Sequence, residues 1–529
     1  MKKATTEKLK KFTKSINPAT GEILGYSPQH SVLYLKQAVV EAREAQKDWA
    51  VLSLRQRANR IQAIRYFLVE KADELAQVIS RDNGKTRVDA FLAEVIPAAM
   101  AISYYSKQAS KFLSDYSFKP GSIAFFNKRT KMVRVPYGVV GIISPWNYPF
   151  SIAFSEIIMA ILAGNAVVLK TATETQMVGL ALKECIEAAQ LPKGIFTYVN
   201  IPGQIAGSAF IESGIDKLFF TGSVDVGKQI MAKAAQTLTP VNLELGGNDA
   251  MLVCEDANLY RAAAGAAWAG FHNAGQSCGS VERIYVHEAI YDPFMKMLKQ
   301  KVETLRVGVD FNFEVDIGAM TTQKQMNTVR CHVNEALSKG ATLFAQSPVL
   351  GNSHSLNLLP AMVLTDVNHT MRLMREETFG PVVGVMKVKN IEEGISFIND
   401  SNLGLTGSVW CSNIKKAETI ARKIQAGVVT INDHLISHAM PEAPWGGFKD
   451  SGIGRTHGQL GFEEMTRPQT VISDLVPYVK QNLWWYPSNL LVYQGFKGLL
   501  EGLYSKDWNH RFRGFVSLSK LVPRLFKSR

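Results

Sequence analysis

Short apolar runs alternate with helical stretches from residue 138 onward, and this alternation limits the possible folds more than any other feature. Amphipathic segments such as 176–190 separate the runs. The alternation is typical of βαβ units and of a parallel sheet covered on both faces, so the sequence predicts an α/β fold. The runs lie at 139–143, 166–169, 196–199, 217–220, 250–253 and 361–364.

The N-terminal part has a different pattern, because apolar residues recur at helical spacing over 34–115. The 529 residues correspond to three or four domains of ~150 residues, and the composition is typical of a globular protein. The first eight residues lack an apolar core, so we expect no signal peptide.

The cysteine pattern indicates a reducing compartment, and we expect a cytoplasmic protein. The five cysteines are an odd number, are widely spread and contain no CxxC pair, which argues against a disulfide framework or a zinc ribbon. The ten histidines do not cluster at ligand spacings, so no metal site is predicted. The cysteines are Cys185, Cys254, Cys278, Cys331 and Cys411.

The formal net charge of +13 is concentrated at the two ends of the chain. Residues 1–14 hold six Lys and one Glu, and residues 476–529 hold nine Lys and Arg against Glu501 and Asp507. A nearly neutral body with basic ends argues against nucleic acid and favours an anionic surface as the partner of the termini.

Residues 135–155 carry no charge over 21 positions, which is long enough to suggest a membrane span. Pro136, Pro145 and Pro149 would break a lone helix repeatedly. We therefore expect a buried strand followed by an irregular loop.

The segment Phe219–Lys228 predicts a phosphate-binding turn. A strand-like run leads into Gly222, and a helical apolar face follows, so free backbone N–H groups at a helix start would attract phosphate. Gln229 stands where a P-loop needs Ser or Thr for magnesium, which excludes that class of NTPase.

Glu244 and Cys278 are candidate catalytic residues. Cys278 has small neighbours, Ser277 and Gly279, so its thiol would be open to a substrate. A lone cysteine is more often a small core residue, and a lone carboxylate beside two glycines is usually solvated. Residues outside these segments decide between the alternatives.

Several further motifs occur in an order that resembles the aldehyde dehydrogenase superfamily, over about residues 15–475. The resemblance implies a Rossmann-like parallel-sheet cofactor domain, a second α/β catalytic domain and a small β oligomerisation element. The motifs are Pro145–Phe150, Gly164–Lys170, Glu244–Asn248, Gly275–Cys278, Glu376–Pro381 and Pro444–Arg455.

The resemblance implies that an aldehyde is oxidised to a carboxylic acid with NAD or NADP. Cys278 would form a thiohemiacetal and then a thioester, and Asn147 would hold the oxyanion together with the Cys278 N–H. Glu244 would activate the water that hydrolyses the thioester. The other cysteines carry no matching motif and are expected in the core.

The resemblance also implies a set of cofactor contacts. Thr173 stands where relatives usually carry a Glu that repels a 2′-phosphate, so use of NADP becomes plausible, although Glu174 could partly restore a preference for NAD. The predicted cofactor residues are Trp146, Lys170, Thr173, Gly203, Gly222, Ser223, Gly227, Glu377 and Phe379.

The expected domains are 1–117 with 137–246 for NAD(P), 247–455 for catalysis, and 118–136 with 456–475 for assembly into a homodimer or homotetramer. Ser155 stands at a position where members of the family often carry a large aromatic residue beside the substrate tunnel, so we expect a wider tunnel here.

Two alternative functions remain, a CoA-acylating aldehyde dehydrogenase and a catalytically idle scaffold that binds membranes. The intact Glu244 motif argues against the first, and the complete catalytic set argues against the second.

A basic tail, 476–529, follows the part that resembles the family. It holds eleven aromatic residues interleaved with its nine basic ones, a composition suited to a membrane–water interface. The alternative is a tail that packs on the protein. We expect a small-molecule aldehyde as substrate, and peripheral contact with an anionic membrane stays an open alternative.

Overall fold

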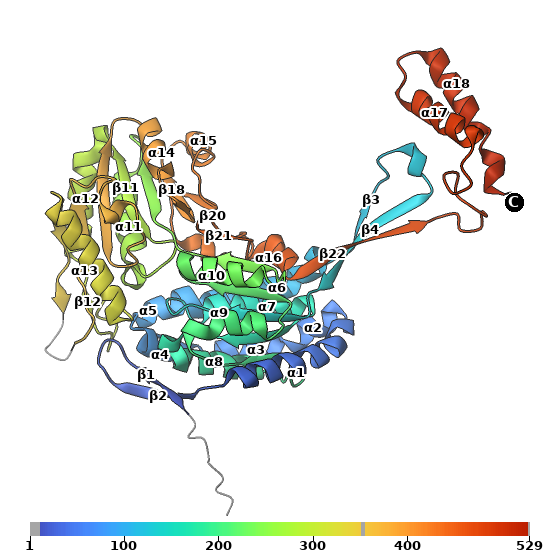
Figure 1. Cartoon of the computed structure of the whole chain (residues 1–529). Helices are drawn as coiled ribbons and strands as arrows, with labels where there is room; N and C mark the ends of the chain where they lie inside the picture. Colours follow the sequence, from blue (N-terminus) through green and yellow to red (C-terminus); the bar gives the residue numbers. More distant parts are fainter. Residues whose placement is uncertain (1–10, 351–354, 527–529) are drawn as a thin grey trace, which may run out of the picture. The chain divides into compact units, whose positions relative to one another are not determined.

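The computed structural model describes residues 11–350 and 355–526, and it divides into two compact units (Figure 1). The first unit comprises residues 1–113 and 136–467, and the second comprises 114–135 and 468–529. Residues 1–10 lie outside the described part, and with them most of the basic N-terminal segment.

The predicted N-terminal helical region forms a series of helices that ends at Phe112. Ser31 caps the first of them, because its hydroxyl accepts a hydrogen bond from the Tyr34 N–H at 3.1 Å. The helices are α1 (Val32–Val51), α2 (Leu54–Arg60), α3 (Gln62–Glu70), α4 (Ala72–Asn83), α5 (Arg87–Ala90) and α6 (Ile96–Phe112), with a π-helical turn at Phe91–Val95.

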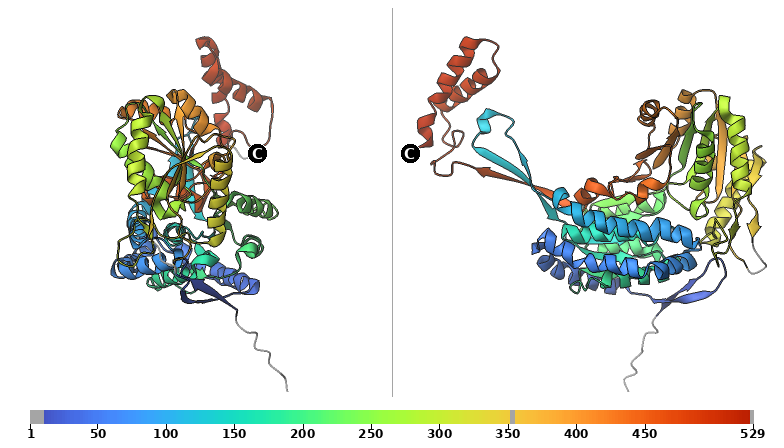
Figure 2. Two further views of the ribbon diagram at one scale, coloured as in Figure 1. Left: turned by 90° about the vertical axis from the view of Figure 1, so that its left-hand side faces the viewer. Right: turned by 180° about the vertical axis from the view of Figure 1, so that it is seen from behind.

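The first unit contains a six-stranded sheet in the order β21-β9-β8-β5-β6-β7, parallel except for the edge strand β21. Helices α1, α7, α8, α9 and α10 pack against it, which confirms the Rossmann-like α/β architecture (Figure 2). The strands are β5 (Val139–Ile143), β6 (Ala166–Lys170), β7 (Phe196–Tyr198), β8 (Lys217–Thr221), β9 (Val241–Glu244) and β21 (Gly452–Ile453); the helices are α7 (Ser151–Ala163), α8 (Gln176–Glu187), α9 (Gly203–Glu212) and α10 (Val224–Ala234).

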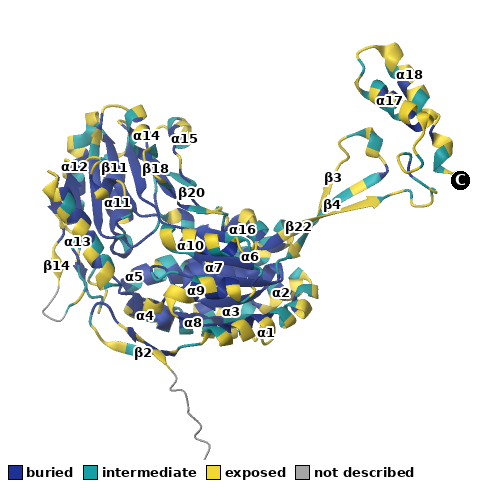
Figure 3. Cartoon of the chain, in the orientation of Figure 1, coloured by how far each residue is buried: buried dark blue, intermediate teal, exposed yellow. Residues whose placement is uncertain are grey.

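A seven-stranded sheet forms the second core of this unit, in the order β13-β15-β16-β11-β10-β18-β19, and only β13 runs antiparallel. Its central strands are almost wholly buried, as Figure 3 shows. The strands are β10 (Asp249–Val253), β11 (Val281–His287), β13 (Thr342–Gln346), β15 (Met362–Thr365), β16 (Val382–Val388), β18 (Thr406–Trp410) and β19 (Val428–Ile431); α11 (Leu259–Phe271), α12 (Tyr291–Glu303), α13 (Gln323–Ser338), α14 (Ile391–Asn399) and α15 (Ile414–Ala421) accompany them.

The uncharged stretch 135–155 contains the buried strand β5, an irregular loop at 144–150 and the start of α7, as predicted. All thirteen residues of α7 are buried, so its apolar composition is that of a core helix. Within the described residues, only Arg87–Phe112 has the length and hydropathy of a membrane-crossing helix, and half of its most apolar window is buried in the protein.

The second unit consists of a three-stranded sheet and a helical tail. The sheet has the order β22-β4-β3, and Asp474 joins its strands by an ion pair with Lys128 at 2.5 Å and a bond from Asn482 Nδ2 at 3.2 Å. The elements are β3 (Tyr116–Phe118), β4 (Lys128–Pro136), β22 (Thr466–Asp474), α17 (Leu490–Tyr504) and α18 (Trp508–Ser519).

Two segments belong to a different part of the structure from the one in which they were expected. Helix α16 (Gly458–Glu464) packs on α6 and α7 in the first unit, although its residues were expected in the assembly element. Strand β21 pairs with β9, so the end of the expected catalytic segment completes the other sheet. Long-range pairing decided both positions, and hydropathy within a short segment does not report it.

Candidate active site

Cys278 follows a loop whose backbone is held in an unusual conformation. Asn273, Ala274 and Gly275 all have positive φ, at 53°, 55° and 68°. The Gln276 side chain fixes this loop, because its Oε1 accepts from the Thr321 N–H at 2.9 Å and its Nε2 donates to the Asn273 oxygen at 3.0 Å. Such a constrained loop gives the thiol a defined position.

Asn147 lies beside this loop, with its backbone held and its side chain free. Its backbone oxygen accepts hydrogen bonds from Lys85 Nζ at 2.7 Å and from Asn273 Nδ2 at 3.1 Å. Its side-chain amide has no hydrogen-bond partner among the described residues, and Oδ1 is buried. The amide is therefore available for an oxyanion that forms on a substrate.

Glu244 ends strand β9 and is buried, and neither of its carboxylate oxygens has a partner within the described residues. Burial is the largest cause that raises the pKa of Glu244 well above its usual range. The negative charge of Glu156 raises the pKa further, and Arg455 opposes both. A carboxyl group of this kind can take a proton from water near neutral pH.

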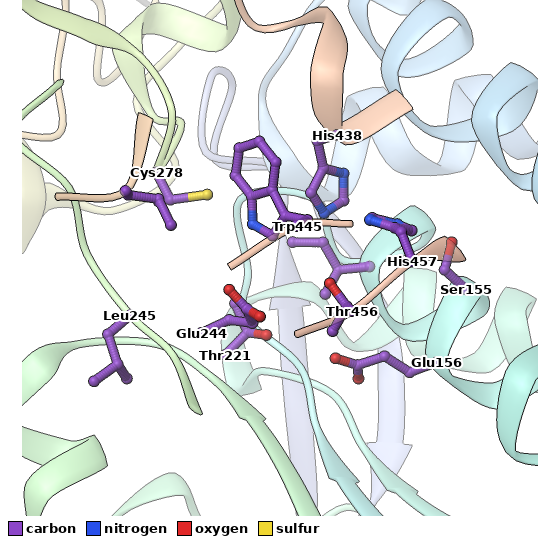
Figure 4. Close-up of a pocket in the computed structure, with 12 residues that line it drawn as sticks. Ser155, Glu156, Thr221, Glu244, Leu245, Cys278, His438, Trp445, Thr456 and His457 are labelled. Carbon is purple, nitrogen blue, oxygen red and sulfur yellow. The ribbon is translucent and has the colours of Figure 1, made fainter. Parts of the chain in front are cut away.

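Two cavities meet at Cys278. The smaller one contains Glu244 and Glu156, and Figure 4 shows Cys278 and Glu244 on the same side of it. The larger one has a volume of about 610 Å³ and a mainly apolar lining. The thiol therefore lies between an apolar chamber and a polar pocket. Apolar lining residues include Leu92, Met100, Trp268, Phe313 and Leu435.

Ser155 lies in the smaller cavity and does not line the larger one. The expectation that it widens the substrate tunnel therefore needs correction. Ser155 is on helix α7 and lines the smaller cavity together with Glu156. Residues of the π-helical turn and of α6 line the larger cavity instead.

Several residues predicted to bind the nucleotide lie at the carboxyl edge of the six-stranded sheet. Lys170 ends β6, Gly222 and Ser223 follow β8 and precede α10, and Gly203 begins α9. Strand β5 has β6 on one side and β8 on the other, which makes the crevice at which doubly wound sheets bind nucleotides. The two helix starts provide free N–H groups for phosphates.

The environment of Lys170 is compatible with a nucleotide bound at this edge of the sheet. It is 5% exposed, and its ammonium has no ion pair or hydrogen bond among the described residues. Burial lowers the pKa of Lys170, and the nearby charge of Glu174 opposes this. A buried donor without a protein partner suits ribose hydroxyl groups. Thr173 is exposed beside it, in the 3-10 turn Thr173–Thr175.

Gly227 lies within helix α10, where it allows close packing, and not in the predicted phosphate-binding turn. It is in the first turns of α10, where a Cβ would come within 2.6 Å of the Leu245 side chain. Its lack of a side chain lets the helix approach the Glu244–Asn248 loop closely, so its contribution to the nucleotide site is indirect.

Glu377 and Phe379 lie on one loop near the thiol. The Gly247 N–H donates to Glu377 Oε1 at 3.2 Å, and the Phe379 ring lies edge-on to Trp146 with centroids 5.4 Å apart. Buried Glu282 fixes this loop by accepting the Phe379 N–H at 2.7 Å. Burial raises the pKa of Glu282 to about 7.

Several residues of the site give no signal in the sequence. Lys85 and Glu94 form a fully buried ion pair at 2.6 Å, yet both lie outside the predicted motifs, and charged side chains are usually exposed. Glu282 is likewise a charged residue outside the motifs. Only the fold brings their side chains to the loops that they hold.

The expectation that all other cysteines are in the core is wrong for Cys331, which is exposed on α13. Cys254 and Cys411 are buried and lie beside Asp256, with the three ligand atoms within 4.8 Å. The hydrogen bonds of this cluster are made within the protein, because Asp256 accepts one from the Asn413 N–H at 3.1 Å and one from the Cys411 thiol at 3.5 Å.

The comparisons with known proteins agree with this geometry. The model of the aldehyde dehydrogenase family matches residues 4–471. The 4,4'-diapolycopene aldehyde oxidase of Methylomonas sp is 37% identical over 493 residues, which are 93% of this chain and 91% of that protein. A putative NADP-dependent succinate-semialdehyde dehydrogenase of Mycolicibacterium smegmatis is 36% identical over 461 residues, 86% of this chain and 88% of that protein.

Solved structures are similar over nearly the same length. An NAD-dependent aldehyde dehydrogenase from Sinorhizobium meliloti has a TM-score of 0.85 at 32% identity, covering 90% of this chain and 93% of that one. The betaine aldehyde dehydrogenase from Staphylococcus aureus in complex with NAD⁺ has a TM-score of 0.83 at 29% identity, covering 90% and 94%. The chain therefore belongs to the aldehyde dehydrogenase family and is an NAD(P)-dependent oxidoreductase that acts on aldehydes.

Proposed function

We propose that the protein oxidises an apolar, medium- or long-chain aldehyde to the carboxylic acid. The main support for this proposal is the larger, mainly apolar cavity that is lined in part by Cys278. The relative from Methylomonas sp is named for an aldehyde of diapolycopene, which supports an elongated apolar substrate.

A short, charged substrate such as succinate semialdehyde is the second candidate, because the mycobacterial relatives are named for it. Its free carboxylate would need a cation in the chamber. Arg306 lines the chamber, but its guanidinium already pairs with Asp316 at 2.8 Å, and His272 faces Asp89 at 3.1 Å. The lining therefore favours the apolar substrate.

In the proposed reaction the Cys278 thiolate attacks the aldehyde carbon, and the oxyanion rests between the Asn147 amide and the Cys278 N–H. NAD(P), when bound, would supply the hydride acceptor, and loss of the hydride from the carbon bonded to Cys278 Sγ would leave a thioester on Cys278. Glu244 then removes a proton from water, and the hydroxide attacks the thioester. Lys170, Gly203, Gly222 and Ser223 would hold the nucleotide, together with Glu377, Phe379 and Trp146.

A CoA-acylating reaction would pass the thioester to CoA and would not need this base. Glu244 is buried, has no hydrogen-bond partner within residues 11–350 and 355–526, and lies in one pocket with Cys278, which supports hydrolysis. Exposed Thr173 supports use of NADP, whereas the proximity of Glu174 to Lys170 favours NAD.

The test is a panel of aldehydes with two to sixteen carbons, plus succinate semialdehyde, assayed with both nucleotides. Each buried CH₂ is worth about 0.8 kcal/mol, so kcat/KM should rise about threefold to fourfold per carbon until the chamber is filled. A preference for succinate semialdehyde over hexanal would reject the apolar substrate, and an absolute requirement for CoA would reject hydrolysis.

We also propose that the tail, 476–529, rests on an anionic membrane surface and that the protein is otherwise cytoplasmic. Helices α17 and α18 meet through glycines, since a Cβ on Gly498 would lie 2.5 Å from the Gly514 oxygen. Their large side chains consequently remain outside, and basic groups lie among them. Exposed examples are Tyr493, Leu500, Tyr504, Lys506, Trp508, Phe512, Arg513, Phe515 and Lys520.

Assembly into a homodimer or homotetramer belongs to the same proposal. Strand β22 is at the edge of its sheet, and most of its side chains are exposed, so it offers unpaired backbone groups to a second copy. Light scattering of the full chain, and of a variant with Pro in place of Val471, tests this assembly.

A further inference from the structure

A second carboxyl group, that of Glu156, lies in the pocket of Glu244. Glu156 comes from α7 and is 3% exposed, and no described residue gives it an ion pair or a hydrogen bond. Burial raises the pKa of Glu156 to about 8. An ionisable group buried without a partner costs stability, so a purely structural role does not account for it.

The pocket has room for a water molecule between these groups. About 20 Å³ is open to the centre of a water, and one water needs roughly 10–15 Å³ by the same measure. Figure 4 shows Glu156 and Glu244 entering the pocket from different elements, with Thr456 between them. A water there would have several polar partners.

The other titratable groups around the pair do not replace either carboxyl. His438 and His457 line the pocket, but burial lowers the pKa of both, that of His438 to about 4. Arg455 favours the ionised form of Glu244, whereas Glu464 disfavours it. The Arg455 guanidinium donates to the Gly447 and Gly454 oxygens, at 3.2 and 2.6 Å.

Tyr105 and Cys278 complete the surroundings. The charge of Glu156 contributes to the raised pKa of Tyr105, and the charge of Glu244 to that of Cys278. Tyr105 is a weaker acid than a carboxylic acid and keeps its proton, and Cys278 carries the acyl group during the water step, so neither takes part in the proton transfer between the two Glu residues.

We propose that Glu156 is a positioning residue for the water step, sharing one proton with Glu244. The inference rests on the proposed role of Glu244 as the base. A negative charge on one of two close carboxyl groups raises the pKa of the other, so an ionised Glu156 makes the Glu244 carboxylate a stronger base, and Glu156 can then take over the proton that Glu244 has removed.

The step is balanced as follows in atoms and electrons. An O–H bond of water breaks, its proton binds to the Glu244 carboxylate, and the hydroxide oxygen bonds to the thioester carbon. The C–S bond then breaks, and its electron pair stays on Cys278 Sγ while the acid leaves. The proton on Glu244 passes to the Glu156 carboxylate, directly or through the pocket water, and leaves from there to solvent.

The experiment compares Glu156→Gln with Ser151→Ala, a variant on the same helix α7 at a residue that lines neither cavity. In Glu156→Gln, single-turnover hydride transfer should stay within twofold of the parent enzyme, while the steady-state rate should fall about tenfold at neutral pH. The acid limb of the steady-state pH profile should move to lower pH, because the like charge beside Glu244 is gone. Ser151→Ala should change neither the rate of the water step nor the position of the acid limb.

Glu156→Asp keeps a carboxyl group and should recover part of the steady-state rate, which separates proton sharing from damage to the pocket. If Glu156→Gln does not fold, Glu156→Asp is used for the test, and its expected result is a displaced acid limb of the steady-state pH profile. An unchanged rate and pH profile in the folded variants would overturn the inference. Glu244→Gln is run alongside, and if it hydrolyses thioester at the parent rate, the proposed function itself fails.

Discussion

The ammonium group of Lys85 lies 2.7 Å from the backbone oxygen of Asn147, and it is wholly shielded from solvent. Glu94 balances its charge at 2.6 Å and also accepts the Phe150 N–H at 2.7 Å. The Tyr148 ring lies 4.2 Å from the ammonium. Lys85 and Glu94 thus fix the backbone of the segment that carries Asn147.

Replacing Lys85 with Met should lower the free energy of unfolding by about 3–5 kcal/mol, because Glu94 is left as a buried, unpaired charge. Urea unfolding followed by circular dichroism measures this. In Lys85→Met/Glu94→Leu most of the stability should return, but kcat should stay low because the Asn147 backbone oxygen has lost its hydrogen bond from Lys85. Full activity in the double variant would show that the network does not position Asn147.

Cys278→Ala should abolish NAD(P)H formation and leave nucleotide binding within about twofold, since the thiol forms the covalent intermediate and the sheet edge holds the nucleotide. Cys331→Ala, at an exposed cysteine, should retain full activity and serves as the control. Nucleotide binding is read by fluorescence titration. Turnover in Cys278→Ala above a few per cent would contradict the assignment.

The pH dependence of the parent enzyme should reflect the buried thiol. Burial, the largest cause, raises the pKa of Cys278 above its ordinary value, and negative neighbours including Glu377 add to this. Because the thiolate is the nucleophile, kcat/KM for an aldehyde should still be rising at pH values above the ordinary thiol pKa of about 8.5. A plateau reached by pH 7 would mean that the bound nucleotide or substrate stabilises the thiolate.

Glu244→Gln should slow hydrolysis of the thioester far more than hydride transfer, since only the water step needs the base. Rapid mixing should then give a burst of NAD(P)H close to the enzyme concentration, followed by a slow steady state. Loss of the burst together with the steady rate would mean that Glu244 acts earlier, in activating Cys278.

Thr173→Glu should shift the preference toward NAD by more than tenfold in the ratio of kcat/KM values. A new carboxylate ~4 Å from a 2′-phosphate would repel it by up to ~4 kcal/mol at an effective dielectric constant of ~20, before screening. Glu174→Gln is the matched variant and should shift the ratio toward NADP, because a negative charge near Lys170 is removed. Unchanged ratios in both would remove Thr173 from the ribose site.

Truncation after Leu475 should remove most binding to vesicles that contain anionic lipid, while activity on short aldehydes is retained. Each basic residue near such a surface is worth ~1 kcal/mol, and the exposed aromatic side chains add an attraction that salt does not screen. Binding of the full chain, read by co-sedimentation, should weaken with salt without vanishing. A full chain that never binds vesicles, with a truncated form of lower Tm, would favour a tail packed on the protein.

The strands and the catalytic motifs could be predicted because both are encoded locally. Four strands of the six-stranded sheet, β5 to β8, lie at predicted apolar runs, and β6 is buried at all five positions. Cys278, Glu244 and Asn147 stand in motifs whose order along the chain carries the resemblance. Cys278 and Glu244 line one pocket of unit 1, and Asn147 lies beside the loop that precedes Cys278.

The tertiary structure alone decided which isolated polar residues support the site. Lys85, Glu94, Glu156 and Glu282 are charged residues outside the predicted motifs, and the ordinary expectation for a charged side chain is exposure to solvent. Their burial follows from contacts between segments far apart in the chain, such as β11 with the Glu377–Phe379 loop. Local patterns specify elements and motifs, whereas the partner of a buried charge is set by long-range packing, which no short stretch of sequence contains.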